Sequence, residues 1–137
     1  MTSLFADTSA LYAAADRRER DHDVCREAYE RALRAGDTIV TTEFVLAELH
    51  ALAVRRSYPD AALKLVRGLT TTGRIDVEPV GPTRLMSALD LLAARPGRPY
   101  SLADAVSFIV MRERGIHRAL TLDADFASEG FEVVPAA

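Results

Sequence analysis

The stretch that decides the fold is Ser3-Leu-Phe-Ala-Asp7-Thr-Ser-Ala-Leu11, close to the start of the chain. Its short apolar run, residues 3–6, predicts a buried β-strand, and the apolar spacing that follows predicts a helix at residues 10–15. One acidic residue, Asp7, stands between them. A strand that leads directly into a helix is the first half of a β-α-β unit, so this stretch indicates an α/β fold.

The rest of the chain repeats the alternation of strand and helix. Further strands are predicted at residues 38–41, 75–78, 118–122 and 132–134. Helical patterns fill the gaps at residues 24–35, 43–56, 60–70, 83–94 and 102–114, with a short helical turn after Asp123. Four of these helices are followed by residues typical of helix C-termini, namely Gly36, Gly73, Pro96-Gly97 and Gly115. This order predicts α/β architecture with a mostly parallel sheet.

Length and composition fit one ordinary domain. The chain has 137 residues, 49% of them hydrophobic, so residues 1–137 are expected to form a single domain with one core. No apolar run reaches the roughly 18 residues of a membrane span, and the start lacks the basic segment of a signal peptide. Cys25 is the only cysteine and is expected to be a half-buried, unreactive thiol. These features predict a cytoplasmic protein, and the charged residues 16–23 are expected to form a mobile loop.

Acidic residues follow two of the predicted strands. Asp7 ends the strand at residues 3–6, and Asp123 and Asp125 follow the strand at residues 118–122. Ligands of open parallel sheets bind beyond the carboxyl ends of the strands, so these acids are expected at one edge of the sheet. Asp7 and Asp123 each have a structural alternative, because an aspartate just before a helix is also a good N-cap.

Two further acids lie in predicted helices. Glu48 borders the apolar stripe of the helix at residues 43–56, and its structural alternative is a flanking side chain that reaches water. Asp104 is the only charged residue in segment 102–111, which is otherwise apolar enough to predict a buried helix. A buried carboxylate costs several kcal/mol unless it is paired or binds a metal. The alternative for Asp104 is a capping box with Ser101, and the two roles are compatible.

Several carboxylates at one site repel one another unless a cation binds between them. Oxygen ligands from Asp and Glu fit Mg²⁺ or Mn²⁺. Zinc is less suitable, because the histidines show no paired ligand spacing, and they are given no role. A magnesium ion held by acids suits phosphodiester hydrolysis. The hydroxyls of Thr8, Ser9 and Thr121 are candidates to hold a water or a phosphate oxygen, although turn chemistry explains them equally well.

The charge of the chain bears on a nucleic-acid partner. A formal net charge of −3 argues weakly against one. Five of the negative charges belong to the predicted site acids, so the remainder of the chain carries +2. The arginines on either side of the helix at residues 102–114 are candidate contacts for backbone phosphates: Arg95, Arg98, Arg112, Arg114 and Arg118. The simpler alternative for scattered arginines is a solvated surface.

Four segments together resemble the signature segments of PIN domains, in the family's order and over almost the whole chain. They are Phe-Ala-Asp7-Thr-Ser-Ala-Leu, Thr-Thr-Glu-Phe-Val-Leu-Ala-Glu48-Leu, Ser-Leu-Ala-Asp104-Ala-Val-Ser-Phe and Ala-Leu-Thr-Leu-Asp123-Ala-Asp-Phe126. The length of the chain and the Arg-Glu-Arg-Gly-Ile run after the third segment are similar to VapC toxins of bacterial toxin–antitoxin pairs.

This resemblance implies a PIN-like α/β/α sandwich with about five strands and a Mg²⁺- or Mn²⁺-dependent endoribonuclease. Asp7, Glu48, Asp104 and Asp123 would hold the metal and carry catalysis, with Asp125 as an auxiliary acid. Members of the family commonly cut tRNA or ribosomal RNA, form homodimers and are held inactive by a cognate antitoxin protein. The implied partners are therefore RNA, an antitoxin and a second copy of the chain.

Other small acidic α/β classes match less well. A receiver-type domain needs a lysine at the end of a strand, whereas Lys64 lies in a helical pattern. A haloacid-dehalogenase-type phosphatase needs Asp-x-Asp after the first strand, where this chain has Asp7-Thr-Ser. Two alternatives stay open: a catalytically inert PIN-like module that binds RNA or protein, and a metal-dependent DNA nuclease.

Overall fold

The computed structural model of the chain describes residues 2–135 and contains a five-stranded sheet. The strand order is β3-β2-β1-β4-β5, and every neighbouring pair is parallel. The strands are β1 (Ser3–Ala6), β2 (Thr38–Thr42), β3 (Ile75–Glu78), β4 (Arg118–Leu120) and β5 (Glu132–Val134). The prediction of a parallel α/β sheet is confirmed.

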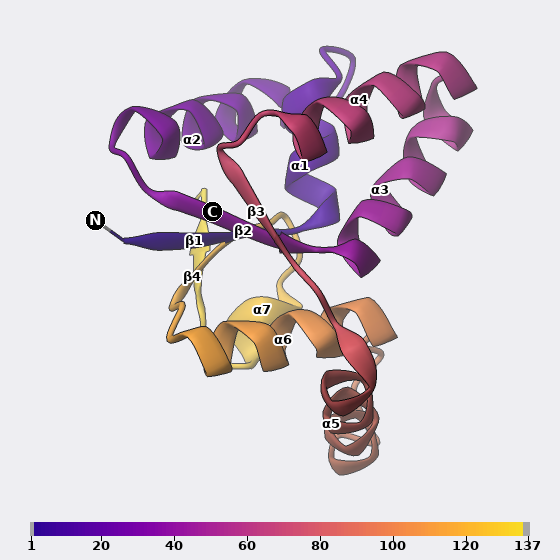
Figure 1. Ribbon diagram of the computed structural model, residues 1–137, viewed down its shortest axis with the longest axis vertical. Coiled ribbons are helices and arrows are strands. Elements are labelled where there is room, and N and C mark those ends of the chain that lie inside the picture. Colours follow the sequence, from indigo (N-terminus) through magenta and orange to yellow (C-terminus); the bar gives the residue numbers. More distant parts are fainter. Residues whose placement is uncertain (1, 136–137) are drawn as a thin grey trace.

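Helices connect successive strands and cover both faces of the sheet. They are α1 (Thr8–Ala15), α2 (His22–Arg34), α3 (Glu43–Arg56), α4 (Pro59–Thr71), α5 (Gly81–Ala94), α6 (Leu102–Arg114) and α7 (Asp125–Ser128). Figure 1 shows α1 to α4 on one face of the sheet and α6 and α7 on the other, with α5 beyond α6. The chain is therefore an α/β/α sandwich, as the resemblance implied.

Two of the boundaries that differ from the predictions lie beside Asp7 and Asp123, at the carboxyl end of the sheet. Helix α1 begins at Thr8 rather than at residue 10. Strand β4 ends at Leu120 rather than at residue 122. The strand stops early because the backbone N–H groups of Leu122 and Asp123 donate to side-chain hydroxyls (2.9 and 3.0 Å) instead of to a neighbouring strand.

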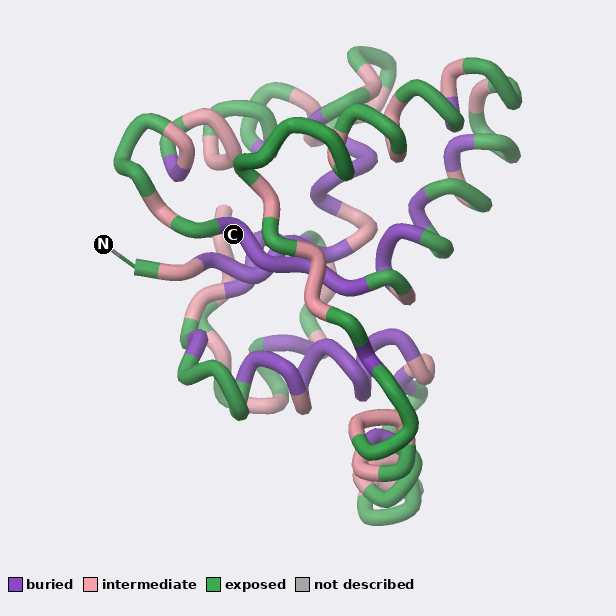
Figure 2. Tube along the Cα trace, viewed as in Figure 1, coloured by how far each residue is buried: buried purple, intermediate pink, exposed green. Residues whose placement is uncertain are grey.

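The core that positions the acids is densest around α6. Most of this helix is buried, including its only acidic residue before the last turn, Asp104. Phe108 of α6 packs edge-on against Tyr100 and Phe126, with ring centroids 5.1 and 4.9 Å apart. Figure 2 shows the trace of α6 mostly in the buried colour. The predicted burial of this helix is confirmed, and it fixes Asp104 at the rim of the core.

The structure differs from two smaller predictions, which concern Cys25 and the charged loop at residues 16–23. Cys25 is fully buried rather than half-buried, and burial raises the pKa of its thiol to about 11. The charged loop after α1, expected to be mobile, is held by ion pairs that join Asp16 to Arg18 (2.8 Å) and Glu19 to Arg56 (2.6 Å). Among the described residues, no helix combines the length and apolar character needed to cross a membrane.

Candidate active site

The carboxyl ends of β1 and β4 meet where the order of the strands reverses. Strand β1 pairs with β2 on one side and with β4 on the other, so the chain builds outward from β1 in both directions. Such a switch point is where open parallel sheets bind ligands. Asp7 follows β1 and Asp123 comes shortly after β4. The fold thus brings acids from opposite ends of the sequence to one edge of the sheet, as predicted.

Asp7 is a buried carboxylate held by side-chain hydroxyls. It is only 5% exposed, and although it occupies the N-cap position of α1, its side chain makes no cap hydrogen bond. Its Oδ2 instead accepts hydrogen bonds from the hydroxyls of Thr121 (2.9 Å) and, at longer range, Ser9 (3.4 Å). Burial raises the pKa of the Asp7 carboxyl to about 7, and the charges of Asp104 and Asp123 add to the increase. The N-cap alternative is therefore wrong for the Asp7 side chain.

The hydroxyls of Ser9 and Thr121 tie the start of α1 to the loop after β4. Their oxygens lie 3.3 Å apart. Ser9 accepts the backbone N–H of Leu122 (2.9 Å), and Thr121 accepts that of Asp123 (3.0 Å). Because the single hydroxyl proton of Thr121 goes to Asp7, this residue links the carboxylate of Asp7 to the backbone of Asp123. The pair therefore fixes the relative position of two acids from different elements.

Asp104 makes the capping box that was its structural alternative. Its Oδ2 accepts the backbone N–H of Ser101 (3.0 Å), and its own N–H donates to Ser101 Oγ (3.0 Å). The capping box engages only Oδ2 and leaves Asp104 at the edge of the cluster, 9% exposed. Burial, followed by the charges of Asp123 and Glu48, raises the pKa of Asp104. The two roles predicted for this residue are geometrically compatible.

Asp104, Asp123 and Asp125 form the tightest group of acids. One carboxylate oxygen from each lies within 4.8 Å of the others. Asp123 Oδ1 accepts the backbone N–H of Asp125 (2.9 Å), so the loop orients Asp123, and α7 begins after it with Ala124 at the N-cap position. Burial and the neighbouring Asp123 raise the pKa of Asp125. Asp125, predicted as an auxiliary acid, thus lies inside the cluster rather than beside it.

Glu48 approaches the cluster from α3. Thr8 Oγ1 donates a hydrogen bond to Glu48 Oε1 (3.2 Å), which joins the first turn of α1 to α3. Glu48 is exposed, yet its charge contributes to the raised pKa of Asp104 on α6. The carboxylate of Glu48 therefore repels that of Asp104, although it lies outside the tight group of Asp104, Asp123 and Asp125. It also reaches water, as its structural alternative required.

We call Asp7, Glu48, Asp104, Asp123 and Asp125 the acidic cluster. Its ligand atoms fit a hard divalent cation. They are carboxylate oxygens, and no lysine or arginine among residues 2–135 forms an ion pair with any of the five acids. Burial and mutual repulsion raise the pKa of Asp7, Asp104 and Asp125, which means that their ionised forms lack a compensating charge. A divalent cation that prefers oxygen ligands, such as Mg²⁺ or Mn²⁺, would supply that charge.

Glu129 is a buried charged residue that the sequence did not reveal. Its side chain is 4% exposed and forms ion pairs with Arg95 (3.1 Å) and Arg112 (2.9 Å), and it accepts a hydrogen bond from Tyr100 (2.8 Å). Burial works to raise the pKa of Glu129, but hydrogen bonds from Arg112, Tyr100 and Arg95 bring it down to about 2. Glu129 follows a short charged turn, where no apolar periodicity indicates burial.

Ion pairs distinguish the arginines that were predicted to bind phosphate, because only some of them have a partner among the described residues. Arg95 and Arg112 have a structural partner in Glu129. Arg114 pairs with two acids of β3, and Arg118 pairs with Asp37 just before β2. Arg98 is exposed and makes no ion pair within the described chain. Its charge works against the raised pKa of Asp125, which places it near the acidic cluster. Arg98 is therefore the best placed of the predicted arginines to meet a phosphate beside the acids.

A parallel sheet with acids from four segments at its switch point defines the PIN class of α/β proteins. Residues 4–131 match the PIN domain. The chain therefore belongs to the PIN-domain family, which confirms the resemblance seen in the sequence.

Relatives and solved structures place the chain close to VapC proteins. It is 31% identical over 133 residues to "23S rRNA-specific endonuclease VapC20" of Mycobacterium tuberculosis, covering 96% of this chain and 98% of the relative. It is 28% identical over 120 residues to "Ribonuclease VapC26" of the same species, covering 88% and 86%. The crystal structure of M. tuberculosis VapC20, described as a sarcin–ricin-loop-cleaving toxin, superposes with a TM-score of 0.84 at 30% identity over 94% and 96% of the chains.

A more distant structure shares the fold alone. The VapBC complex from Salmonella typhimurium bound to DNA superposes with a TM-score of 0.69 at 19% identity, over 97% of both chains. At this identity the match supports the arrangement of helices and strands, and it carries no argument about binding or activity.

Proposed function

We propose that this chain is a metal-dependent endoribonuclease and the toxin of a toxin–antitoxin pair. The observation that carries the proposal is the convergence of Asp7, Glu48, Asp104 and Asp123 at the switch point of the sheet, without a paired cation among the described residues. The similarity to two VapC ribonucleases over most of the chain supports RNA as the substrate. An inert binding module would not require an acid at each of these positions.

In this proposal the acids hold Mg²⁺ or Mn²⁺. Asp104, Asp123 and Asp125 already offer oxygens within 4.8 Å of one another, and Asp7 and Glu48 complete the ligand set. When bound, the ion would supply Lewis acidity that activates water and neutralises charge on the phosphate. The pKa of about 7 at Asp7 describes the metal-free protein, in which the buried carboxyl lacks a neighbouring cation, and a bound ion would stabilise its ionised form.

The remaining side chains orient the acids and the substrate. Thr121 and Ser9 hold Oδ2 of Asp7, so the proposal assigns the opposite oxygen of that carboxylate to the metal. Thr8 restrains Glu48. Arg98 is placed to contact a backbone phosphate next to the scissile bond, since a charged hydrogen bond to phosphate both binds and orients RNA.

Ribosomal RNA is the substrate class that we favour. VapC20, which shares 31% identity over nearly the full length of both proteins, is named for cleavage of 23S rRNA. The alternative within the family is tRNA. The proposal includes an antitoxin that blocks the site, a homodimer and a cytoplasmic location, all of which rest on the family membership.

The test is expression of the chain in bacteria without a partner protein. Wild-type chain should arrest growth, and sequencing of RNA 5′ ends shortly after induction should reveal new ends at one or a few sites in ribosomal RNA. Asp104→Asn and Asp7→Asn should abolish both effects. Asp90→Asn is the matched control, because Asp90 is an exposed acid on α5, away from the cluster. Equal toxicity from folded Asp104→Asn protein would contradict the site assignment. Growth arrest without new RNA ends, together with breaks in chromosomal DNA on a gel, would favour a DNA nuclease.

A further inference from the structure

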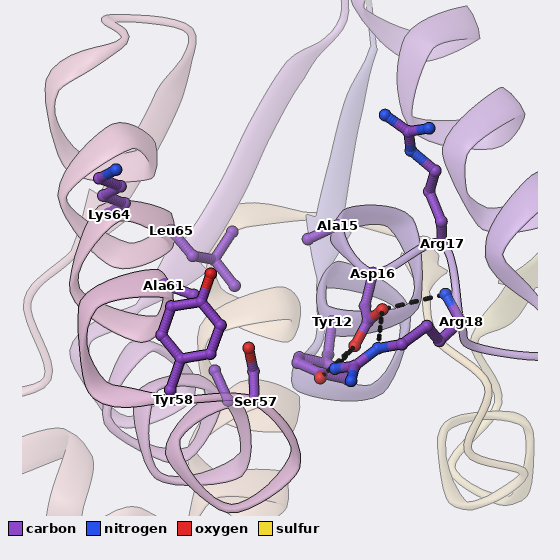
Figure 3. Close-up of a pocket in the computed structure, with 11 residues that line it drawn as sticks. Tyr12, Ala15, Asp16, Arg17, Arg18, Ser57, Tyr58, Ala61, Lys64 and Leu65 are labelled. Atoms are coloured by element: carbon purple, nitrogen blue, oxygen red, sulfur yellow. Dashed lines mark hydrogen bonds and ion pairs between the residues drawn. The ribbon is translucent and has the colours of Figure 1, made fainter.

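A concave site lies away from the acidic cluster. It is a pocket of about 610 Å³ between the end of α1 with its following loop and the junction of α3 with α4. We call it the α1–α4 pocket. Figure 3 shows Tyr58, Lys64 and Leu65 on one wall, and Asp16 with the two arginines that follow it on the other.

The pocket carries an excess of positive charge in a chain whose net charge is −3. Its charged lining residues are Asp16, Arg17, Arg18 and Lys64. Arg18 donates two hydrogen bonds to the carboxylate of Asp16 (3.0 and 2.8 Å), and this pairing lowers the pKa of Asp16 well below its usual range. Arg17 and Lys64 form no ion pair among residues 2–135. Arg17 and Lys64 are therefore available to bind an anion.

The same pocket offers an aromatic surface next to these cations. Tyr58 is 62% exposed, although it precedes α4 at the N-cap position, where its side chain makes no cap hydrogen bond. Ala15, Ala61 and Leu65 supply apolar lining beside it. A ligand with a flat ring and a negative charge matches this combination, because bases stack on aromatic side chains while phosphates pair with basic ones.

The position of the pocket suits a strand of RNA that also reaches the acids. Tyr12 lines the pocket one helical turn after Thr8, and Ala53 lines it little more than one turn after Glu48. Helices α1 and α3 pack against each other, so both lead from the acidic cluster to the pocket. At a rise of about 1.5 Å per residue, Ser57 lies roughly 13 Å beyond Glu48 along α3, a span of a few nucleotides.

We infer that the α1–α4 pocket binds one nucleotide of the RNA substrate, outside the scissile phosphate. The base stacks on Tyr58, and the phosphates on either side of it pair with Lys64 on one wall of the pocket and with Arg17 on the other. This inference rests on the proposed function, and it adds a contact that extends the footprint of the RNA beyond the acidic cluster. A protein segment carrying an acidic aromatic residue is the competing occupant, and the experiment separates the two.

The experiment measures RNA binding by the full chain carrying Asp104→Asn, which prevents cleavage in the proposed mechanism. The probe is a fluorescein-labelled single-stranded RNA 12-mer of mixed sequence, followed by fluorescence anisotropy over a range of salt concentrations. Tyr58→Ala should weaken binding roughly tenfold, whereas Tyr58→Phe should retain it, because stacking on one aromatic ring is worth about 1–3 kcal/mol. Lys64→Ala should lower the slope of log Kd against log salt by about 0.7, the loss of one phosphate contact to a single strand.

Arg67→Ala is the matched control, because Arg67 is an exposed cation on α4 that does not line the pocket. Binding and salt slopes of Tyr58→Ala and Lys64→Ala equal to those of Arg67→Ala would overturn the inference. Unchanged RNA binding by Tyr58→Ala and Lys64→Ala, combined with loss of inhibition by a partner protein, would also overturn the inference. Cleavage of ribosomal RNA by wild-type chain tests the proposed function separately: if wild type cleaves and the pocket variants bind normally, only the pocket assignment is wrong.

Discussion

Replacing Asp7 by asparagine should make the metal-free protein more stable at alkaline pH. The wild-type carboxylate is buried and lies near Asp104 and Asp123, and its pKa is raised from 3.8 to about 7. An acid with a raised folded-state pKa destabilises the fold once the pH exceeds its unfolded value, and the penalty is complete above the folded value. Asparagine keeps an oxygen that can accept from Thr121 and removes the charge, so it removes this penalty.

The size of the effect follows from the pKa of Asp7. At about pH 8 the ionisation penalty is about 4 kcal/mol, and at about pH 4.5 it is about 1 kcal/mol. Part of the gain is lost because the new amide N–H₂ needs acceptors of its own. We therefore expect Asp7→Asn to add roughly 2 to 4 kcal/mol to the free energy of unfolding at about pH 8, or roughly 6 to 12 °C in Tm for a chain of this length.

The assay is thermal unfolding of both proteins in EDTA, followed by circular dichroism at several pH values. The difference in Tm between variant and wild type should grow as the pH rises from about 4.5 to about 8. Asp90→Asn, an exposed acid on α5, should show no such growth. A Tm difference for Asp7→Asn that is independent of pH, or a variant less stable than wild type at about pH 8, would refute the account of a crowded, uncompensated carboxylate.

Two further predictions concern side chains that support the site. Glu129→Gln should lower the free energy of unfolding by about 3 kcal/mol at neutral pH, the value that corresponds to a pKa lowered from 4.5 to about 2. Chemical denaturation should show this loss shrinking as the pH falls from about 4.5 to about 2, because the carboxyl is protonated first in the unfolded chain and only near pH 2 in the folded protein. Equal stability of the two proteins at neutral pH would contradict it. Thr121→Val should lower the free energy of unfolding by about 1 to 3 kcal/mol, because Asp7 and the backbone N–H of Asp123 lose their shared partner. It should also lower kcat for RNA cleavage more than it raises KM, and Thr121→Ser should restore both stability and kcat. A Thr121→Val protein with normal kcat would show that the hydroxyl does not position the acids.

Much of the fold could be predicted because apolar periodicity is a local signal. The strand at residues 3–6 and the helix at residues 102–114 appear at these positions in the structure. The order of strands could not be read from the same patterns, since it depends on which strand pairs with which. The apolar pattern also does not predict the early end of β4, because the hydroxyl of Ser9, from a distant segment, and the local hydroxyl of Thr121 accept the backbone N–H groups that would have continued the strand.

The site could be predicted where an acid stood out against an apolar background. The sequence pattern indicates Asp104 and Asp7 for this reason, and both lie close to the other acids in the structure. Glu129 was not visible, because its burial comes from two arginines and a tyrosine that converge from other segments. For the same reason Arg95 and Arg112 resembled free cations in the sequence.

Cleavage of purified ribosomal RNA under metal control tests the central claim most directly. The chain is first treated with EDTA, and cleavage is then measured before and after Mn²⁺ or Mg²⁺ is added back, with Asp104→Asn and Asp90→Asn in parallel. A metal centre built from these acids predicts no cleavage in EDTA, recovery with either ion in wild type and Asp90→Asn, and none in Asp104→Asn. Undiminished cleavage after complete chelation, or full activity of Asp104→Asn, would contradict it.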